Sequence, residues 1–72
     1  MTHISFMLPV DSKVRIAVYN LLGEEVVELA NSEFISGKHI INFDATEYTS
    51  GVYFYRLKTN EFVETKKMIL MR

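Results

Sequence analysis

Hydrophobic and polar side chains alternate along most of this chain, and a period of two is the pattern of strands with one buried face. The clearest case is residues 13–19, where Val14, Ile16 and Val18 share one face while charged and aromatic side chains occupy the other. β-Branched residues at alternate positions suit the pleated surface of a sheet and lower the helix propensity. The alternation therefore predicts a β-protein rather than a bundle of helices.

The same pattern predicts five more strands, at residues 2–8, 24–30, 38–44, 52–58 and 62–71. Residues 24–30 could also form a short helix by propensity, but Gly23 and the Asn31-Ser32 pair favour a bounded strand. Residues 52–58 are apolar or aromatic on both faces, which predicts a central strand covered on both sides. Lys66 and Lys67 interrupt the last segment, which could be one strand or two, with a bulge or a sheet edge at the lysines.

Turn signals separate these segments at intervals of about 8–12 residues, as in a compact β-sandwich or barrel. Gly23 is expected to have a positive φ, and polar residues 44–51 predict a loop that could contain one helical turn. The predicted fold is all-β and antiparallel, with six to seven short strands. The side chains expected to face inward are Ile4, Phe6, Leu8, Val14, Ile16, Val18, Ile41, Phe43, Leu57 and either Phe54 or Tyr55.

Composition argues against several classes of function. The 72 residues include no cysteine, so there is no disulfide, no thiolate nucleophile and no Cys-ligated zinc site. The formal net charge of −1 argues against a nucleic-acid-binding protein that needs a basic face. No apolar run reaches the roughly 20 residues of a membrane helix, so membrane insertion is not expected.

No group of polar residues has the spacing of an active site. His3 and His39 are 36 residues apart without a clustered carboxylate, which predicts surface or strand-edge positions rather than metal ligation. Glu24, Glu25 and Glu28 could hold a hard cation, but solvated charges on one side of a strand are the favoured interpretation. The serines lie in turns or strands outside any nucleophile motif. Neither a cofactor nor enzymatic activity is expected.

Two features are compatible with a binding function. The aromatic run 53–55 could stack on single-stranded nucleic acid or sugar, although filling the core with one face is the favoured interpretation. Residues 20–51 carry six acids and one base, whereas residues 52–72 carry five bases and two acids. The second half could be an interaction surface, or folding could bring the two halves together and neutralise them. The residues by themselves predict a small all-β interaction or structural module.

Five segments occur in an order and spacing that carry a family resemblance: residues 4–9, 18–26, 37–44, 50–57 and 66–70. Together they closely resemble the type A C-terminal sorting domain of the type IX secretion system, from about Thr2 to Arg72. The Asn-Pro-type segment that often precedes the first strand in this family is absent. We therefore expect residues 1–72 to be a single C-terminal sorting domain excised from a longer secreted protein.

The resemblance implies an Ig-like antiparallel β-sandwich that acts without catalysis. It implies that a cargo protein passes from the periplasm across the outer membrane of a Gram-negative bacterium, to the cell surface or the medium. The implied partners are the outer-membrane secretion translocon and a sortase-like protease. An Ig-like sandwich of the flagellar hook-capping type shares part of the pattern at residues 18–23. A structural accessory or glycan-binding module attached to an enzyme is therefore the alternative.

The resemblance also identifies candidate recognition residues in two elements, a Gly-x-Tyr motif and a basic segment before the last apolar residues. They are Gly51, Tyr53, Lys66, Lys67, Met68, Ile69 and Leu70. The C-terminal strand is expected to offer edge backbone to a receptor strand. The two lysines could equally serve to protect that edge, and Gly51 is also expected to be a turn glycine with positive φ.

Overall fold

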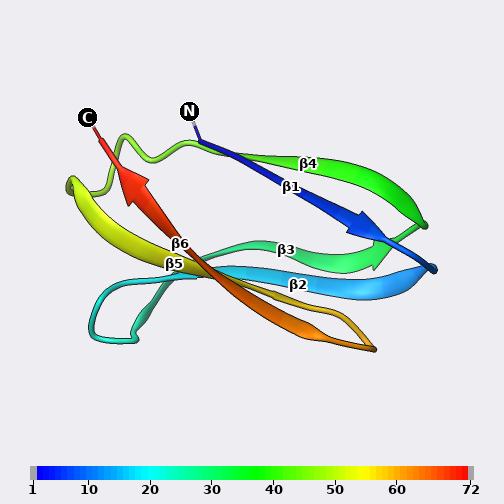
Figure 1. Cartoon of the computed structure of the whole chain (residues 1–72). Helices are drawn as coiled ribbons and strands as arrows, with labels where there is room; N and C mark the ends of the chain where they lie inside the picture. The colour runs from blue at the N-terminus through cyan, green and yellow to red at the C-terminus, as the bar shows by residue number, and fades with distance from the viewer. Residues whose placement is uncertain (1, 72) are drawn as a thin grey trace.

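The computed structural model describes residues 2–71, which form six strands in two antiparallel sheets (Figure 1). The strands are β1 (Thr2–Leu8), β2 (Ser12–Tyr19), β3 (Glu25–Phe34), β4 (Gly37–Phe43), β5 (Gly51–Lys58) and β6 (Val63–Leu70). β1 and β4 form one sheet, and the other four strands form the second in the order β3-β2-β5-β6. The predicted all-β antiparallel sandwich is confirmed.

The core lies between the two sheets, where the alternating apolar side chains of each strand meet. Val14, Ile16 and Val18 on β2 are fully buried, as their spacing predicts. One buried cluster joins β2 and Leu57 to the inner face of β1, and the other joins Val18 to Phe43. Every predicted inward position is buried or half-buried, because a period of two places alternate residues on one face wherever the strand pairs.

β3 is the strand that differs most from its prediction. It is a strand and not a helix, but it continues to Phe34, beyond the predicted end at Ala30. Asn31 and Ser32, which predicted a turn, instead pair with β2. Both are exposed on an edge strand, and the ladder supplies the backbone hydrogen bonds that override their weak strand propensity.

The structure tests two predictions for the C-terminal half, one for β5 and one for β6. β5 is hydrogen-bonded between β2 and β6, as a central strand should be, but only its inner face is covered by the other sheet. Val52 and Phe54 are half-buried on the outer face, so the expected cover on both sides is wrong. β6 is one strand with an unbroken register against β5, and Lys66 and Lys67 therefore lie at a sheet edge without a bulge.

The loops hold the sheet ends in place through side-chain hydrogen bonds. In the β2–β3 turn, the Asn20 side-chain oxygen accepts hydrogen bonds from the backbone N–H groups of Leu22 and Glu24, and Gly23 has a φ of 83° as predicted. The loop between β4 and β5 contains a hydrogen-bonded turn from Ala45 to Tyr48 and no helical turn.

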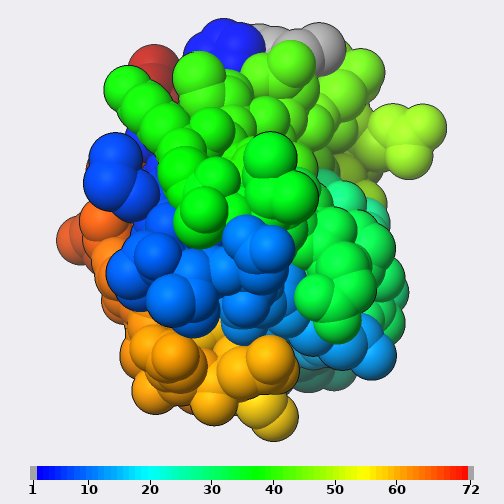
Figure 2. Space-filling view, turned by 90° about the vertical axis from the view of Figure 1, so that its right-hand side faces the viewer, coloured from blue at the N-terminus to red at the C-terminus, as the bar shows by residue number. Residues whose placement is uncertain are grey.

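Three connections gather at one end of the sandwich, which Figure 2 shows from outside with β1–β2 in blue, β3–β4 in green and β5–β6 in orange. Asp11 in the first connection accepts a hydrogen bond from the backbone N–H of Ser36 in the second, at 2.8 Å. Ser12 accepts one from the backbone N–H of Asn60 in the third, at 3.1 Å. These bonds tie strands that are distant in sequence at the same end of the molecule.

Candidate functional site

The predicted recognition residues lie on two paired strands at one edge of the four-stranded sheet. The outer edge of β6 pairs with no other strand of residues 2–71. In the β5–β6 register, Gly51 lies opposite Leu70 and Tyr53 lies opposite Met68. The structure therefore brings the Gly-x-Tyr element beside the last apolar residues, although the rest of the β5–β6 hairpin lies between these two elements in the sequence.

Part of this group is buried and supports the strand from within. Leu70 is 3% exposed and Tyr53 is 8% exposed, and both pack with Val18 and Phe43. The Tyr53 hydroxyl donates a hydrogen bond to the backbone carbonyl of Thr49 at 3.0 Å and lies 3.1 Å from the Thr49 hydroxyl. These side chains hold β5 and β6 in place and are not exposed for contact with a partner.

Lys66 and Lys67 do not form one basic patch. Lys66 lies opposite Tyr55 on the side of the sheet that faces the core, whereas Lys67 lies opposite Phe54 on the outer face. Both side chains are exposed. Lys66 forms an ion pair with Glu64 at 3.1 Å, and the hydrogen bond that Lys66 donates to this carboxylate, aided by the carboxylate's charge, raises the pKa of Lys66.

A groove runs along the inner side of the β6 edge. It has a volume of about 250 Å³ and separates β1 from β5 and β6. Its lining residues come from all three strands: Ser5, Phe6, Met7, Tyr55, Leu57, Glu64 and Lys66. The backbone at the β6 edge therefore adjoins a hollow that is lined by both polar and apolar side chains and has one ion pair at its rim.

The outer side of β6 carries exposed apolar side chains as well. Ile69 is 62% exposed and lies opposite Val52, and Val63 at the start of the strand is 57% exposed. Met68 is half-buried on the inner side. Of the seven candidates, Lys66, Lys67 and Ile69 are the ones whose side chains are largely accessible.

The histidines differ from each other. His3 is exposed, and its Nδ1 hydrogen-bonds with the side chain of Asn42 across the β1–β4 pair. His39 lies on an edge strand, β4, and is half-buried: its ring contacts those of Phe6 and Phe34, at centroid distances of 5.4 and 5.1 Å. Residues 2–71 contain no group of three or more acidic or histidine side chains able to hold a metal ion.

The acidic stretch beside β2 is exposed but paired. Arg15 donates hydrogen bonds to Glu25 at 2.6 Å and to Glu28 at 2.7 Å. The bond from Arg15 lowers the pKa of Glu25, and the two carboxylates raise the pKa of Arg15. Glu24 accepts a hydrogen bond from the Asn20 side chain. These carboxylates are therefore engaged with neighbouring side chains instead of forming a cation site.

The aromatic run at 53–55 does not form a single platform. Successive side chains of a strand point to opposite faces. Tyr53 and Tyr55 face the core, whereas Phe54 lies on the outer face, near Tyr19 and Leu21. The interpretation that one face of this run packs in the core is confirmed.

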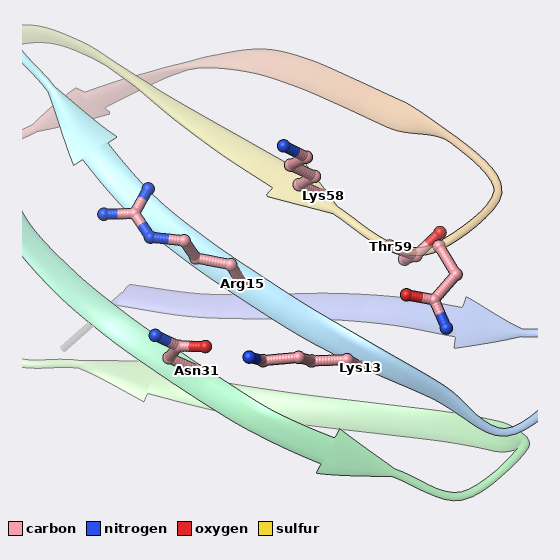
Figure 3. A pocket seen from close by; sticks show the side chains of 6 residues that line it. Lys13, Arg15, Asn31, Lys58 and Thr59 are labelled. Carbon is pink, nitrogen blue, oxygen red and sulfur yellow. The ribbon is translucent and has the colours of Figure 1, made fainter.

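The outer face of the four-stranded sheet has a hollow that the sequence analysis did not identify. It is lined by Lys13, Arg15, Asn31, Lys58, Thr59 and Asn60 (Figure 3). The alternation of residues 13–19 places the first two side chains outward. The others come from β3, from the end of β5 and from the β5–β6 turn, so only the pairing of strands reveals the cluster. In the part of the chain that the structure describes, no helix is long and apolar enough to cross a membrane.

Comparison with known proteins identifies a family for this chain. A family model described as the secretion system C-terminal sorting domain matches residues 1–71. No curated protein and no solved structure gives a significant match. Domains that serve as sorting signals are generally non-catalytic. The chain therefore belongs to the C-terminal sorting domain family of the type IX secretion system, which implies contact with that machinery and export to the cell surface or the extracellular space.

Proposed function

We propose that this chain is the C-terminal sorting domain of a longer protein and directs it across the outer membrane of a Gram-negative bacterium by binding alone. The outer-membrane translocon and a sortase-like protease are its proposed partners. The observation that carries the proposal is the family match over residues 1–71, because it covers nearly the whole chain. The residues themselves favour binding over catalysis, since the accessible candidates are two lysines and an isoleucine.

The proposed mechanism is recognition of the β6 edge. A translocon that exports unrelated cargo must read a feature common to all of them, and a free strand edge offers a row of backbone donors and acceptors. A receptor strand added to β6 would meet Lys66 on one side and Lys67 with Ile69 on the other. The groove toward β1 gives the receptor room on the inner side.

The buried candidates have a positioning role in this proposal. Tyr53 and Leu70 anchor β5 and β6 in the core, so the edge keeps one register. Gly51 begins β5 with a φ of 152°, where a side chain would strain the backbone. Substitutions at these positions would impair export through loss of the strand's geometry, whereas substitutions at Lys67 or Ile69 would impair it with the fold intact.

A secretion assay tests the function directly. Residues 1–72 are fused behind a reporter carrying a periplasmic signal, in a host with a type IX system and in an isogenic host without it. We expect the reporter at the surface or in the medium of the first host and in the periplasm of the second. A folded, intact fusion retained in the periplasm of both hosts would contradict the proposal.

The glycan-binding alternative has less support. Glycan binding would require an aromatic platform at residues 53–55, but Tyr53 is buried and Phe54 faces away from its two neighbours. No observation on the described residues favours a structural accessory over a sorting domain.

A further inference from the structure

The outer face of the four-stranded sheet concentrates positive charge in a chain that is close to neutral overall. Of the seven lysine and arginine residues within 2–71, five lie on this face: Lys13, Arg15, Arg56, Lys58 and Lys67. Strand alternation places them there, because their neighbours Val14, Ile16 and Leu57 are buried on the other side. On the strands, the acids of this face are Glu25, Glu28 and Glu33 of β3, so the bases outnumber them.

Three of these bases, Lys13, Arg15 and Lys58, line a hollow that is formed by three strands and a turn. Asn31, Arg15 and Lys58 form a row across β3, β2 and β5, with Arg15 directly opposite both neighbours. Neighbouring strands are about 4.8 Å apart and residues two apart in a strand are about 7 Å apart, so Lys13 lies close to this row. The hollow has a volume of about 270 Å³, and in Figure 3 the side chains stand on one side of the sheet around it.

The positive charges in the hollow are unequally compensated. Arg15 is paired with Glu25 and Glu28, which fixes its guanidinium on the side of the β3 acids. Among residues 2–71, neither Lys13 nor Lys58 forms an ion pair, although Glu33 lies opposite Lys13 on β3. Like charges on adjacent strands destabilise each other. An anion between the two lysines would relieve that repulsion.

Neutral donors complete the hollow. The side-chain amides of Asn31 and Asn60 form no hydrogen bond with other residues of 2–71, and each amide carries two donor hydrogens. The turn that carries Asn60 is held in place, because the Thr59 hydroxyl accepts hydrogen bonds from the backbone N–H groups of Glu61 and Phe62. The Asn60 N–H is bonded to Ser12 at the start of β2. The backbone of this turn is therefore held in place before binding, which reduces the ordering that a ligand requires.

We propose that this hollow binds a phosphate-type oxyanion, held by the ammonium groups of Lys13 and Lys58 and by the amides of Asn31 and Asn60. A tetrahedral oxyanion presents oxygens in several directions and so meets donors from three strands, whereas a carboxylate presents two oxygens in one plane. The group could be a lipid headgroup phosphate or a soluble phosphate. This inference is independent of the free edge of β6, because the hollow lies at β2, β3, the end of β5 and the β5–β6 turn.

Titration of the ¹⁵N-labelled chain with inorganic phosphate, against chloride at matched ionic strength, tests the site. Saturable shifts are expected at Lys13, Asn31, Lys58 and Asn60. The variant Lys13→Gln/Lys58→Gln should weaken binding by about tenfold or more. The matched control Lys38→Gln/Lys66→Gln removes the same charge away from this face and should leave phosphate affinity within about twofold.

Sedimentation with phosphatidylcholine vesicles, with and without phosphatidic acid, shows whether the bound phosphate group comes from a lipid headgroup or from a soluble ligand. Binding to free phosphate and to phosphatidic acid vesicles, both lost in the Lys13→Gln/Lys58→Gln variant, indicates a lipid headgroup. Binding to free phosphate alone indicates a soluble ligand. Shifts that do not saturate, equal weakening by the two double variants, or vesicle binding without phosphate binding would overturn the proposal, since each reports unspecific attraction.

Discussion

Lys66 and Lys67 are neighbours in the sequence but lie on opposite faces of the four-stranded sheet, Lys66 across from Tyr55 and Lys67 across from Phe54. Lys66 shares the inner rim with Glu64, which neutralises it, whereas Lys67 has no ion-pair partner among residues 2–71. A receptor approaching the β6 edge would therefore meet two separate charges in different surroundings. This difference makes the single substitutions more informative than the double one.

We predict that Lys67→Ala and Lys66→Ala both melt close to the parent, because exposed side chains usually change stability by no more than about 0.5 kcal/mol. Export should fall for the Lys66→Ala/Lys67→Ala variant, and more for Lys67→Ala than for Lys66→Ala, since only Lys67 offers an unpaired charge. Circular dichroism melting and the secretion assay check this. Normal melting together with normal export of the double variant would mean that the lysines only protect an edge.

The exposed apolar side chains of β6 provide a matched comparison. Ile69 and Val63 lie on the same outer face with similar exposure, 62% and 57%, but at opposite ends of the strand. Ile69→Ala should reduce export, whereas Val63→Ala should not, because only the former belongs to the proposed recognition segment. Both variants should keep the parent's melting temperature within a few degrees. Equal export of the two variants would remove Ile69 from the recognition surface.

Phe43 tests the core. Its side chain is 3% exposed and its ring lies 5.5 Å from that of Tyr48. Phe43→Ala should cost about 3–5 kcal/mol through lost burial and the cavity left behind. Small domains have a total stability of about 5–15 kcal/mol, so cooperative thermal unfolding should be lost or shifted far downward. Phe54→Ala, on the half-buried outer face, is the control and should lose much less; a Phe43→Ala protein melting near the parent would contradict the assigned core.

The Tyr53 hydroxyl has a measurable structural role. Tyr53→Phe keeps the ring in the core but removes the hydrogen bond to the Thr49 carbonyl, at an expected cost of about 0.5–1.5 kcal/mol. Tyr55→Phe is the matched control, because among residues 2–71 the Tyr55 hydroxyl forms no hydrogen bond. Urea unfolding of both variants distinguishes the two. Equal midpoints would show that the Tyr53 hydrogen bond adds nothing to stability.

Acidification should weaken the fold through Glu25. Arg15 holds the pKa of Glu25 below its ordinary value of 4.5, so the carboxylate stabilises the folded state above that pH and loses this effect as pH falls through the lower, folded value. The melting temperature should therefore be flat above about pH 5 and decline below it. The decline should be small, because the pair is exposed and screened by solvent.

Arg15→Gln should reduce the part of the decline in melting temperature at acidic pH that comes from Glu25. Arg56→Gln is the control, since Arg56 lies over the Tyr19 ring, 5.1 Å from its centroid, and pairs with no carboxylate of residues 2–71. Melting curves from neutral to acidic pH give the comparison. An unchanged acid slope in Arg15→Gln would show that other carboxyls, such as Asp44 with its Thr46 hydrogen bond, account for the decline.

Local alternation was enough to predict which side of each regular strand faces the core. Val14, Ile16 and Val18 are buried as expected because a period of two assigns faces without reference to the partner strand. Gly23 was likewise predictable, since a turn with positive φ favours glycine whatever lies around it. Leu57 was predicted to face inward. Residues two apart in a strand share a face, so the position of Leu57 favours Tyr55 rather than Phe54 on the same inner face.

Pairing between distant segments decided the rest. β3 continues through Asn31 and Ser32 because β2 provides a ladder for their backbone groups, and no local signal describes that partner. The opposite surroundings of Lys66 and Lys67 depend on the register with β5, and the hollow of Lys13, Asn31 and Lys58 depends on β2 lying between β3 and β5. Sequence alone determined the strands and their faces, because these follow from neighbours along the chain. Only the tertiary structure decided the edges and the surface clusters, because they arise from which strands meet and in which register.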